Sequence, residues 1–174
     1  MIPRKTRIHK GSTKSKSAPP FFPVLIGTGF GVGFWPWGPG TAGALLAILI
    51  WIGASYIFTP FYLLLFTLVV VLLFTFLGIW AADRLEPYWG TDPSRVVVDE
   101  MVGVWIPLLI ATPYAWWHPW IAFLLFRFFD IVKPLGVRKM ENLPGGIGVM
   151  ADDILAGVYS AIILFILKLL CILI

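Results

Sequence analysis

Residues 61–82 read FYLLLFTLVVVLLFTFLGIWAA, a run without a single charged side chain. About 20 consecutive apolar residues are enough for a helix to cross the hydrocarbon core of a bilayer. Two more apolar runs are of membrane length, 41–58 and 154–174. A shorter pair of apolar runs occupies residues 101–117 and 119–133. The sequence therefore predicts an all-α integral membrane protein with about five transmembrane helices, the shorter pair forming a helical hairpin.

The overall composition agrees with this interpretation. Of 174 residues, 59% are hydrophobic and only 13% are charged, and the mean hydropathy is +0.91. A soluble domain carries about 25% charged residues, so this composition excludes one. The single cysteine, Cys171, leaves neither a disulfide framework nor a CxxC metal pair.

Residues 21–41, FFPVLIGTGFGVGFWPWGPGT, are apolar but contain six glycines and three prolines. A straight spanning helix is not expected there, because these residues break helices. The segment suits a Gly/Pro-broken interfacial or re-entrant element, with Phe34, Trp35 and Trp37 at the level of the lipid headgroups.

Basic residues crowd the first sixteen positions: Arg4, Lys5, Arg7, Lys10, Lys14 and Lys16. We expect residues 1–20 to form a disordered basic tail that lies on anionic membrane lipids, and residues 21–174 to form a single membrane-embedded domain. The sequence shows no folded basic surface with base-reading partners, so no nucleic-acid partner is expected.

The remaining Lys and Arg residues predict the orientation, because short loops rich in them stay in the cytoplasm. With the N-terminus inside, five spans put nearly all of them on the cytoplasmic side. Lys168 alone dissents, and we expect it to snorkel outward from the last span. The same threading brings every acidic residue to the cytoplasmic face: Asp83, Glu86, Asp92, Asp99, Glu100, Asp130, Glu141, Asp152 and Asp153.

Several catalytic chemistries are excluded. Cys171 is not followed by the Arg that a cysteine phosphatase needs, His9 lies in the tail, and His118 lies in a loop assigned to the opposite face. The glycine-rich stretch reads Gly38-Pro39 where a nucleotide-binding loop requires Gly-Lys, and no D-x-D pair is present. What remains is carboxylates beside basic residues, the usual composition of a Mg²⁺ site that handles phosphate.

Three segments supply these groups: VVVDEMVG with Asp99 and Glu100, FRFFDIVKP with Arg127, Asp130 and Lys133, and GGIGVMADDILAG with Asp152 and Asp153. Asp99 and Asp152 could instead be helix caps, and Arg127 with Asp130 could be a structural ion pair. Gly145, Gly146 and Gly148 could hold an anion at a helix start or form only a flexible turn. We expect Glu86, Asp92 and Glu141 to be ordinary charged residues in solvated loops.

Together with TGFGVGFWPWGPGTAGALLA at residues 28–47, these three segments resemble, in order, the motifs of the phosphatidylglycerophosphatase A family. The resemblance covers roughly residues 25–161. It implies a Mg²⁺-dependent phosphatase of the bacterial inner membrane that converts phosphatidylglycerophosphate to phosphatidylglycerol. The functional positions that it implies are Thr28, Asp99, Glu100, Arg127, Asp130, Lys133, Asp152 and Asp153. The sequence departs from the family's Lys-Pro-Trp-Pro, with Leu135-Gly136 following Lys133-Pro134.

The resulting hypothesis assigns each position a role at the cytoplasmic face. Asp99, Glu100, Asp152 and Asp153 hold one or two Mg²⁺, while Thr28, Arg127 and Lys133 bind the phosphate. Asp130 orients Arg127 or joins the metal ligands. A water attacking phosphorus in line is the preferred mechanism, and a covalent aspartyl-phosphate is the alternative.

Two other classes of function remain open at this stage, a membrane transporter and a non-catalytic scaffold. Among enzymes, a lipid phosphotransferase is the nearest competitor, but its D-G-x₂-A-R pattern is missing. The sequence leaves the oligomeric state open.

Overall fold

The computed structural model describes residues 17–173, and this part of the chain is helical with no strand. Residues 1–16 of the expected basic tail lie outside the described residues. The elements in chain order are α1 (Phe21–Gly27), a 3₁₀ turn η1 (Val32–Phe34), α2 (Pro39–Ile57), α3 (Pro60–Trp89), α4 (Val98–Leu108), α5 (His118–Val132), α6 (Val137–Met140) and α7 (Gly145–Leu173). The all-α prediction is confirmed.

Three of these helices are long and apolar enough to cross a membrane: α2, α3 and α7. The two helices of the expected hairpin are shorter, with 11 residues in α4 and 15 in α5. The run 101–117 was expected to form one helix, but α4 ends at Leu108, about halfway along the run. Pro107 and Pro113 lie in this stretch, and a proline lacks the N–H that continues a helix. The count of five spans stays a prediction.

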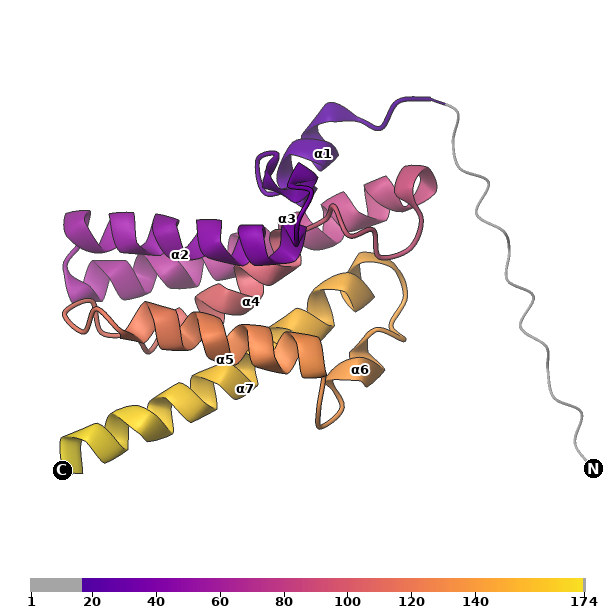
Figure 1. Ribbon diagram of the computed structural model, residues 1–174. Helices are drawn as coiled ribbons and strands as arrows, with labels where there is room; N and C mark the ends of the chain where they lie inside the picture. The colour runs from indigo at the N-terminus through magenta and orange to yellow at the C-terminus, as the bar shows by residue number, and fades with distance from the viewer. Residues whose placement is uncertain (1–16, 174) are drawn as a thin grey trace, which may run out of the picture.

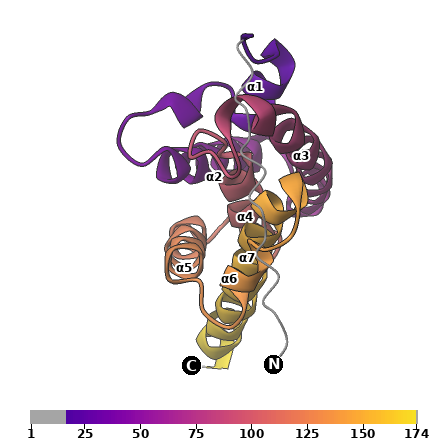
Figure 2. The same cartoon turned by 90° about the vertical axis from the view of Figure 1, so that its right-hand side faces the viewer.

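The long helices run back and forth along one axis, and α4 lies in the middle (Figure 1). Helix α4 packs against α2, α3, α5 and α7, which surround it on all sides (Figure 2). The beginning of α2, the ends of α3 and α5 and the beginning of α7 all lie at the same end of the bundle, on the right in Figure 1. The acidic residues of α4 are therefore enclosed at the end where four other helix termini meet.

The packing around α4 depends on small residues in α2, whose buried face includes Gly43, Ala44 and Ala47. Small residues let two helix backbones approach closely within a membrane. The indole of Trp105 in α4 uses this closeness, since its Nε1 donates a hydrogen bond to the Ala47 carbonyl oxygen at 3.0 Å. Trp51 of α2 in turn donates to Thr67 Oγ1 of α3 at 3.1 Å. These bonds give buried polar groups partners where water is absent.

Lys168 ties the far end of the bundle together. Its Nζ donates a hydrogen bond to the carbonyl oxygen of Ile110, 2.5 Å away, just beyond the end of α4. The last carbonyls of a helix have no partner within the helix, and a basic side chain can supply one. The one cation that the sequence places in the last apolar run therefore has a defined partner on α4's C-terminal side.

The N-terminal glycine-rich segment is a broken element, as expected, with α1 and η1 joined by a tight turn. Gly27 accepts a hydrogen bond from Val97 N at 2.8 Å, which attaches the turn to the residues just before α4. Phe34, Trp35 and Trp37 are exposed, and the Arg95 guanidinium lies over the Phe34 ring at 5.7 Å. An exposed aromatic surface of this kind suits the membrane interface, where the sequence places it.

Candidate active site

Three carboxylates from two helices meet near the beginning of α4. Asp99 and Glu100 lie in the first turn of α4, and Asp153 comes from α7. Each offers an oxygen, and these three oxygens lie within 4.8 Å of one another. Asp99 and Asp153 are 6% and 3% exposed. Buried like charges repel each other strongly unless a cation lies among them, so this cluster has the chemistry of a metal site.

The donor set fits Mg²⁺. The cluster offers only carboxylate oxygens, the ligands this hard cation prefers. Asp99 Oδ1 and Glu100 Oε2 are buried and have no hydrogen-bond partner among the described residues. Such orphaned buried oxygens are costly, and a bound cation would satisfy them.

Arg127 and Asp130 of α5 form an ion pair beside this cluster, with Nη1 and Oδ2 separated by 2.5 Å. The carboxyl group of Asp130 also adjoins that of Asp153. Arg127 Nε is buried without a partner among the described residues. The arginine therefore keeps donor capacity free next to the acids, which a purely structural ion pair would not need.

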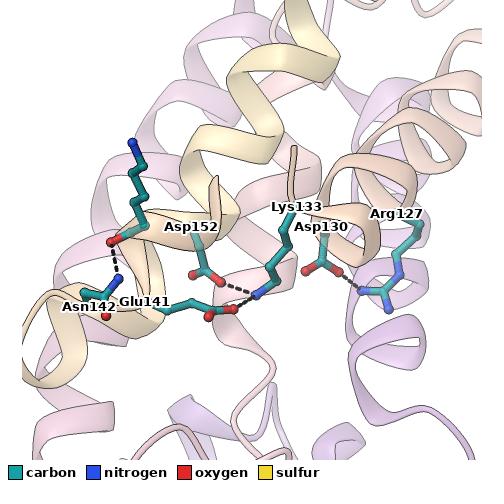
Figure 3. A network of polar contacts seen from close by, with 7 residues as sticks. Arg127, Asp130, Lys133, Glu141, Asn142 and Asp152 are labelled. Carbon is teal, nitrogen blue, oxygen red and sulfur yellow. Dashed lines mark hydrogen bonds and ion pairs between the residues drawn. The ribbon is translucent and has the colours of Figure 1, made fainter. Parts of the chain in front are cut away.

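Lys133 follows α5 and is shared by two carboxylates (Figure 3). Its Nζ lies 2.5 Å from Asp152 Oδ2 and 2.8 Å from Glu141 Oε1. Burial opposes the charge of the lysine, but the hydrogen bonds and charges of the two carboxylates prevail and raise the pKa of Lys133 above its usual range. The lysine is therefore fully protonated at neutral pH.

The two neighbouring aspartates of α7 thus have different surroundings. Asp153 joins the cluster of three, whereas Asp152 pairs with Lys133. Adjacent residues on a helix point in directions about 100° apart, so two neighbouring aspartates cannot both face the same metal ion. The sequence interpretation placed both in the metal shell, and the structure groups only Asp153 with Asp99 and Glu100.

Helix α7 begins earlier than the sequence suggests, at Gly145 instead of Ile154. A Cβ at Gly146 would stand 2.2 Å from the Ile79 carbonyl oxygen of α3, so only glycine lets α7 begin in this place. The Gly146 N–H donates to Asp83 Oδ1 at 2.6 Å. These glycines therefore belong to the first turn of α7 and do not form a flexible turn, and the Gly146 amide is already used by Asp83.

Thr28 lies in the turn between α1 and η1 and is fully buried. Its hydroxyl donates to the Val24 carbonyl oxygen at 2.7 Å and accepts from the Gly31 N–H at 3.0 Å. Both bonds stabilise the turn that packs against the segment before α4. Thr28 therefore has a structural role, in stabilising this turn. The structure does not bring it together with Arg127 and Lys133, the other residues assigned to the phosphate.

Two residues that the sequence did not single out lie at the site. A Cβ on Gly40, at the beginning of α2, would stand 2.0 Å from Glu100 Oε1 and 3.4 Å from Arg127 Nη1. Glu141, expected to be an ordinary loop charge, is bound to Lys133. No spacing rule predicts either contact, because both join segments that come together only in the folded chain. The GPGT sequence around Gly40 is the one local signal of a close approach.

The chain is similar to proteins of known families. A family described as Phosphatidylglycerophosphatase A matches residues 25–168. Relatives with that name occur in Escherichia coli, 39% identical over 90% of this chain and 90% of the relative, and in Haemophilus influenzae, 36% identical over 81% and 85%. A relative from Bacteroides thetaiotaomicron is 66% identical over 84% of this chain and 93% of its own, and carries the provisional name phosphatidylinositol-3-phosphatase. No solved structure matches the chain. The extent of these matches shows that the chain belongs to the phosphatidylglycerophosphatase A family.

Proposed function

We propose that this phosphatase removes the terminal phosphate of phosphatidylglycerophosphate, giving phosphatidylglycerol and inorganic phosphate, at the cytoplasmic face of the bacterial inner membrane. The observation that carries the proposal is the buried cluster of Asp99, Glu100 and Asp153. Arg127 lies beside Glu100, and Lys133 pairs with Asp152, the neighbour of Asp153. A lipid phosphatase needs this combination, because the acyl chains stay in the bilayer while the phosphate reaches charged groups at its edge. Family membership favours an enzyme over a transporter or a scaffold.

Each charged group has a role that its contacts support. Asp99, Glu100 and Asp153 would hold Mg²⁺, which would supply positive charge for the phosphoryl oxygens and for the attacking oxygen. Arg127 and Lys133 donate hydrogen bonds to the remaining phosphoryl oxygens, a task for which cations beside a buried site are well suited. Asp130 holds the Arg127 guanidinium in place at 2.5 Å, and Asp152 holds the Lys133 ammonium.

The reaction itself needs little from the protein besides position and charge. A water oxygen attacks phosphorus opposite the ester oxygen, the P–O bond to the headgroup breaks, and the leaving oxygen takes a proton to become the terminal hydroxyl. Negative charge spreads over the phosphoryl oxygens in this transition state, where Arg127 and Lys133 stabilise it. Transfer to an aspartate first is the alternative, and trapping labelled phosphate on the protein would favour it.

A second candidate substrate is phosphatidylinositol 3-phosphate, which the name of the relative from Bacteroides thetaiotaomicron suggests. Both lipids carry a phosphate monoester on a polyol headgroup that is joined to the diacylglycerol through a phosphodiester. The same charged groups could act on either one. A direct comparison of kcat/KM for the two lipids, in the same mixed micelles, decides between them.

The decisive experiment measures phosphate release from phosphatidylglycerophosphate by the purified full-length protein, with Mg²⁺ and with a chelator. We expect release to require Mg²⁺ and to be abolished by Asp99→Asn and by Asp153→Asn. Thermal unfolding in detergent checks that both variants are folded. Near-normal turnover in both folded variants would refute the assigned site, and flux without hydrolysis in proteoliposomes would refute the reaction.

A further inference from the structure

The two carboxylates that share Lys133 differ in exposure. The Asp152 side chain is 9% exposed and belongs to α7, whereas the Glu141 side chain is 42% exposed and follows the short helix α6. An exposed ion pair contributes little to stability, because water and salt compete for both partners. Asp152 is therefore the fixed partner of Lys133, and Glu141 is the partner that can be replaced.

Glu141 also lies between Lys133 and a cavity. A cavity of about 330 Å³ separates the end of α3 from the beginning of α7, and both Glu141 and Asp152 line it. Figure 3 shows the Glu141 carboxylate reaching Lys133 from the side opposite to Asp130 and Arg127. A ligand that enters from this cavity meets the lysine where Glu141 now contacts it.

The local charge argues against a phosphate joining this arrangement as it stands. One ammonium faces two carboxylates, and the three acids of the cluster lie nearby. A phosphate monoester carries a charge of about −1.5 to −2 at neutral pH, so adding it to a net negative site is unfavourable. Releasing Glu141 leaves Lys133 with Asp152 alone and restores donor capacity for the phosphate.

We infer that Glu141 holds a hydrogen-bond donor of the Lys133 ammonium that the substrate phosphate takes over, so that substrate binding exchanges one oxyanion for another. The inference rests on the proposed function. Its consequence is discrimination between the two lipids: the phosphate monoester of the substrate, with nearly two charges, displaces Glu141, whereas the singly charged phosphodiester of phosphatidylglycerol does so less well. Glu141 thereby favours the lipid substrate over the lipid product and helps phosphatidylglycerol to leave.

The test measures binding of inorganic phosphate to the purified full-length protein in detergent with Mg²⁺, by calorimetry, for wild type, Glu141→Gln and Glu86→Gln. Glu86 lines the same cavity but has no bond to Lys133 among the described residues, so it controls for a general loss of negative charge. We expect Glu141→Gln to bind phosphate about two- to fivefold more tightly, the range of an exposed ion pair. Glu86→Gln should stay close to wild type. In turnover, Glu141→Gln should lower KM without raising kcat.

Three results would overturn the inference. Weaker phosphate binding by Glu141→Gln would mean that Glu141 orients Lys133 for the ligand. Equal tightening in both variants would reduce the effect to general electrostatics, and unchanged or undetectable binding in Glu141→Gln would mean that the position is not shared. Because this binding assay uses no lipid, tighter binding in Glu141→Gln supports the inference even if phosphatidylglycerophosphate proves not to be the substrate.

Discussion

Gly157 of α7 crosses Gly103 of α4 so closely that a Cβ on Gly157 would stand 2.4 Å from the Gly103 carbonyl oxygen. A Cβ on Gly103 would in turn stand 2.9 Å from the carbonyl oxygen of Asp153. Asp99 and Asp153 each lie four residues before the crossing glycine of their own helix. The contact between the two backbones therefore fixes the distance between the carboxylates one helical turn away.

We expect Gly157→Ala to separate α4 from α7 and to lower phosphatase activity about 10- to 100-fold, because small displacements of catalytic groups are costly. Overpacking should also reduce the free energy of unfolding by about 1–3 kcal/mol. Activity assays and denaturation in detergent measure the two effects. Gly53→Ala is the matched control, since a Cβ there meets nothing within 4 Å. Equal activity of the two variants would show that the close contact between α4 and α7 does not determine the geometry of the carboxylates.

Gly40→Ala should act on Glu100 more than on the fold. The added Cβ would collide with Glu100 Oε1, which is the movable end of a side chain, so the carboxylate shifts and the backbone stays. We expect the Mg²⁺ concentration for half-maximal activity to rise, while the unfolding temperature stays near that of wild type. A titration of activity against Mg²⁺ measures the shift. An unchanged titration curve would show that Glu100 is not a ligand of the metal.

The sequence predicts most of the charged site because the relevant spacing is local. Arg127 and Asp130 lie one turn apart on a helix, and their pairing follows from that spacing. The position of Asp99 and Glu100 in the first turn of a helix could likewise be predicted from the sequence. The different partners of Asp152 and Asp153 were open to prediction too, since neighbours on a helix cannot face one point.

What the sequence could not predict depends on chain segments far apart. The contact of Glu141 with Lys133 follows from the turn at Gly136, whose φ is +95°, and from the short helix α6. The early beginning of α7 depends on the Ile79 carbonyl, against which only glycine fits. The length of α4 is a different case, because Pro107 and Pro113 lie inside the apolar run and could have been read from the sequence as signals that the helix ends early.

Mg²⁺ should stabilise the folded protein, because a ligand that binds only the native state adds about 2.7 kcal/mol at a hundredfold excess over Kd. Thermal unfolding in detergent with and without Mg²⁺ measures this directly and requires no substrate. We expect Asp153→Asn to lose the stabilisation. Asp92→Asn should retain it, because Asp92 lies outside the cluster and its φ of +49° suits asparagine equally well. Loss of the shift in both variants would indicate a weaker, general attraction of Mg²⁺ to the acidic end of the bundle.

Asp83 should matter to stability through the beginning of α7. Its Oδ1 accepts the Gly146 N–H at 2.6 Å, so Asp83→Ala leaves a helix-start amide without its partner. The expected cost is about 0.5–2 kcal/mol, as for other lost helix caps. Asp83→Asn keeps an acceptor oxygen and should lose much less. Equal losses in the two variants, measured by unfolding in mixed micelles, would point to the charge of Asp83 and not to its hydrogen bond.

Lys168 offers the opposite case, a charged residue with a structural role in a helix that is long and apolar enough to cross a membrane. Lys168→Met removes the donor to the Ile110 carbonyl, and an unpaired buried carbonyl costs about 1–3 kcal/mol. We expect a lower unfolding temperature in detergent but an unchanged kcat of the folded enzyme, because Lys168 lies at the end of the bundle away from the acids. Lys168→Arg retains a donor and should recover part of the stability. A large loss of kcat in folded Lys168→Met would show instead that the end of α4 is coupled to the carboxylates at its beginning.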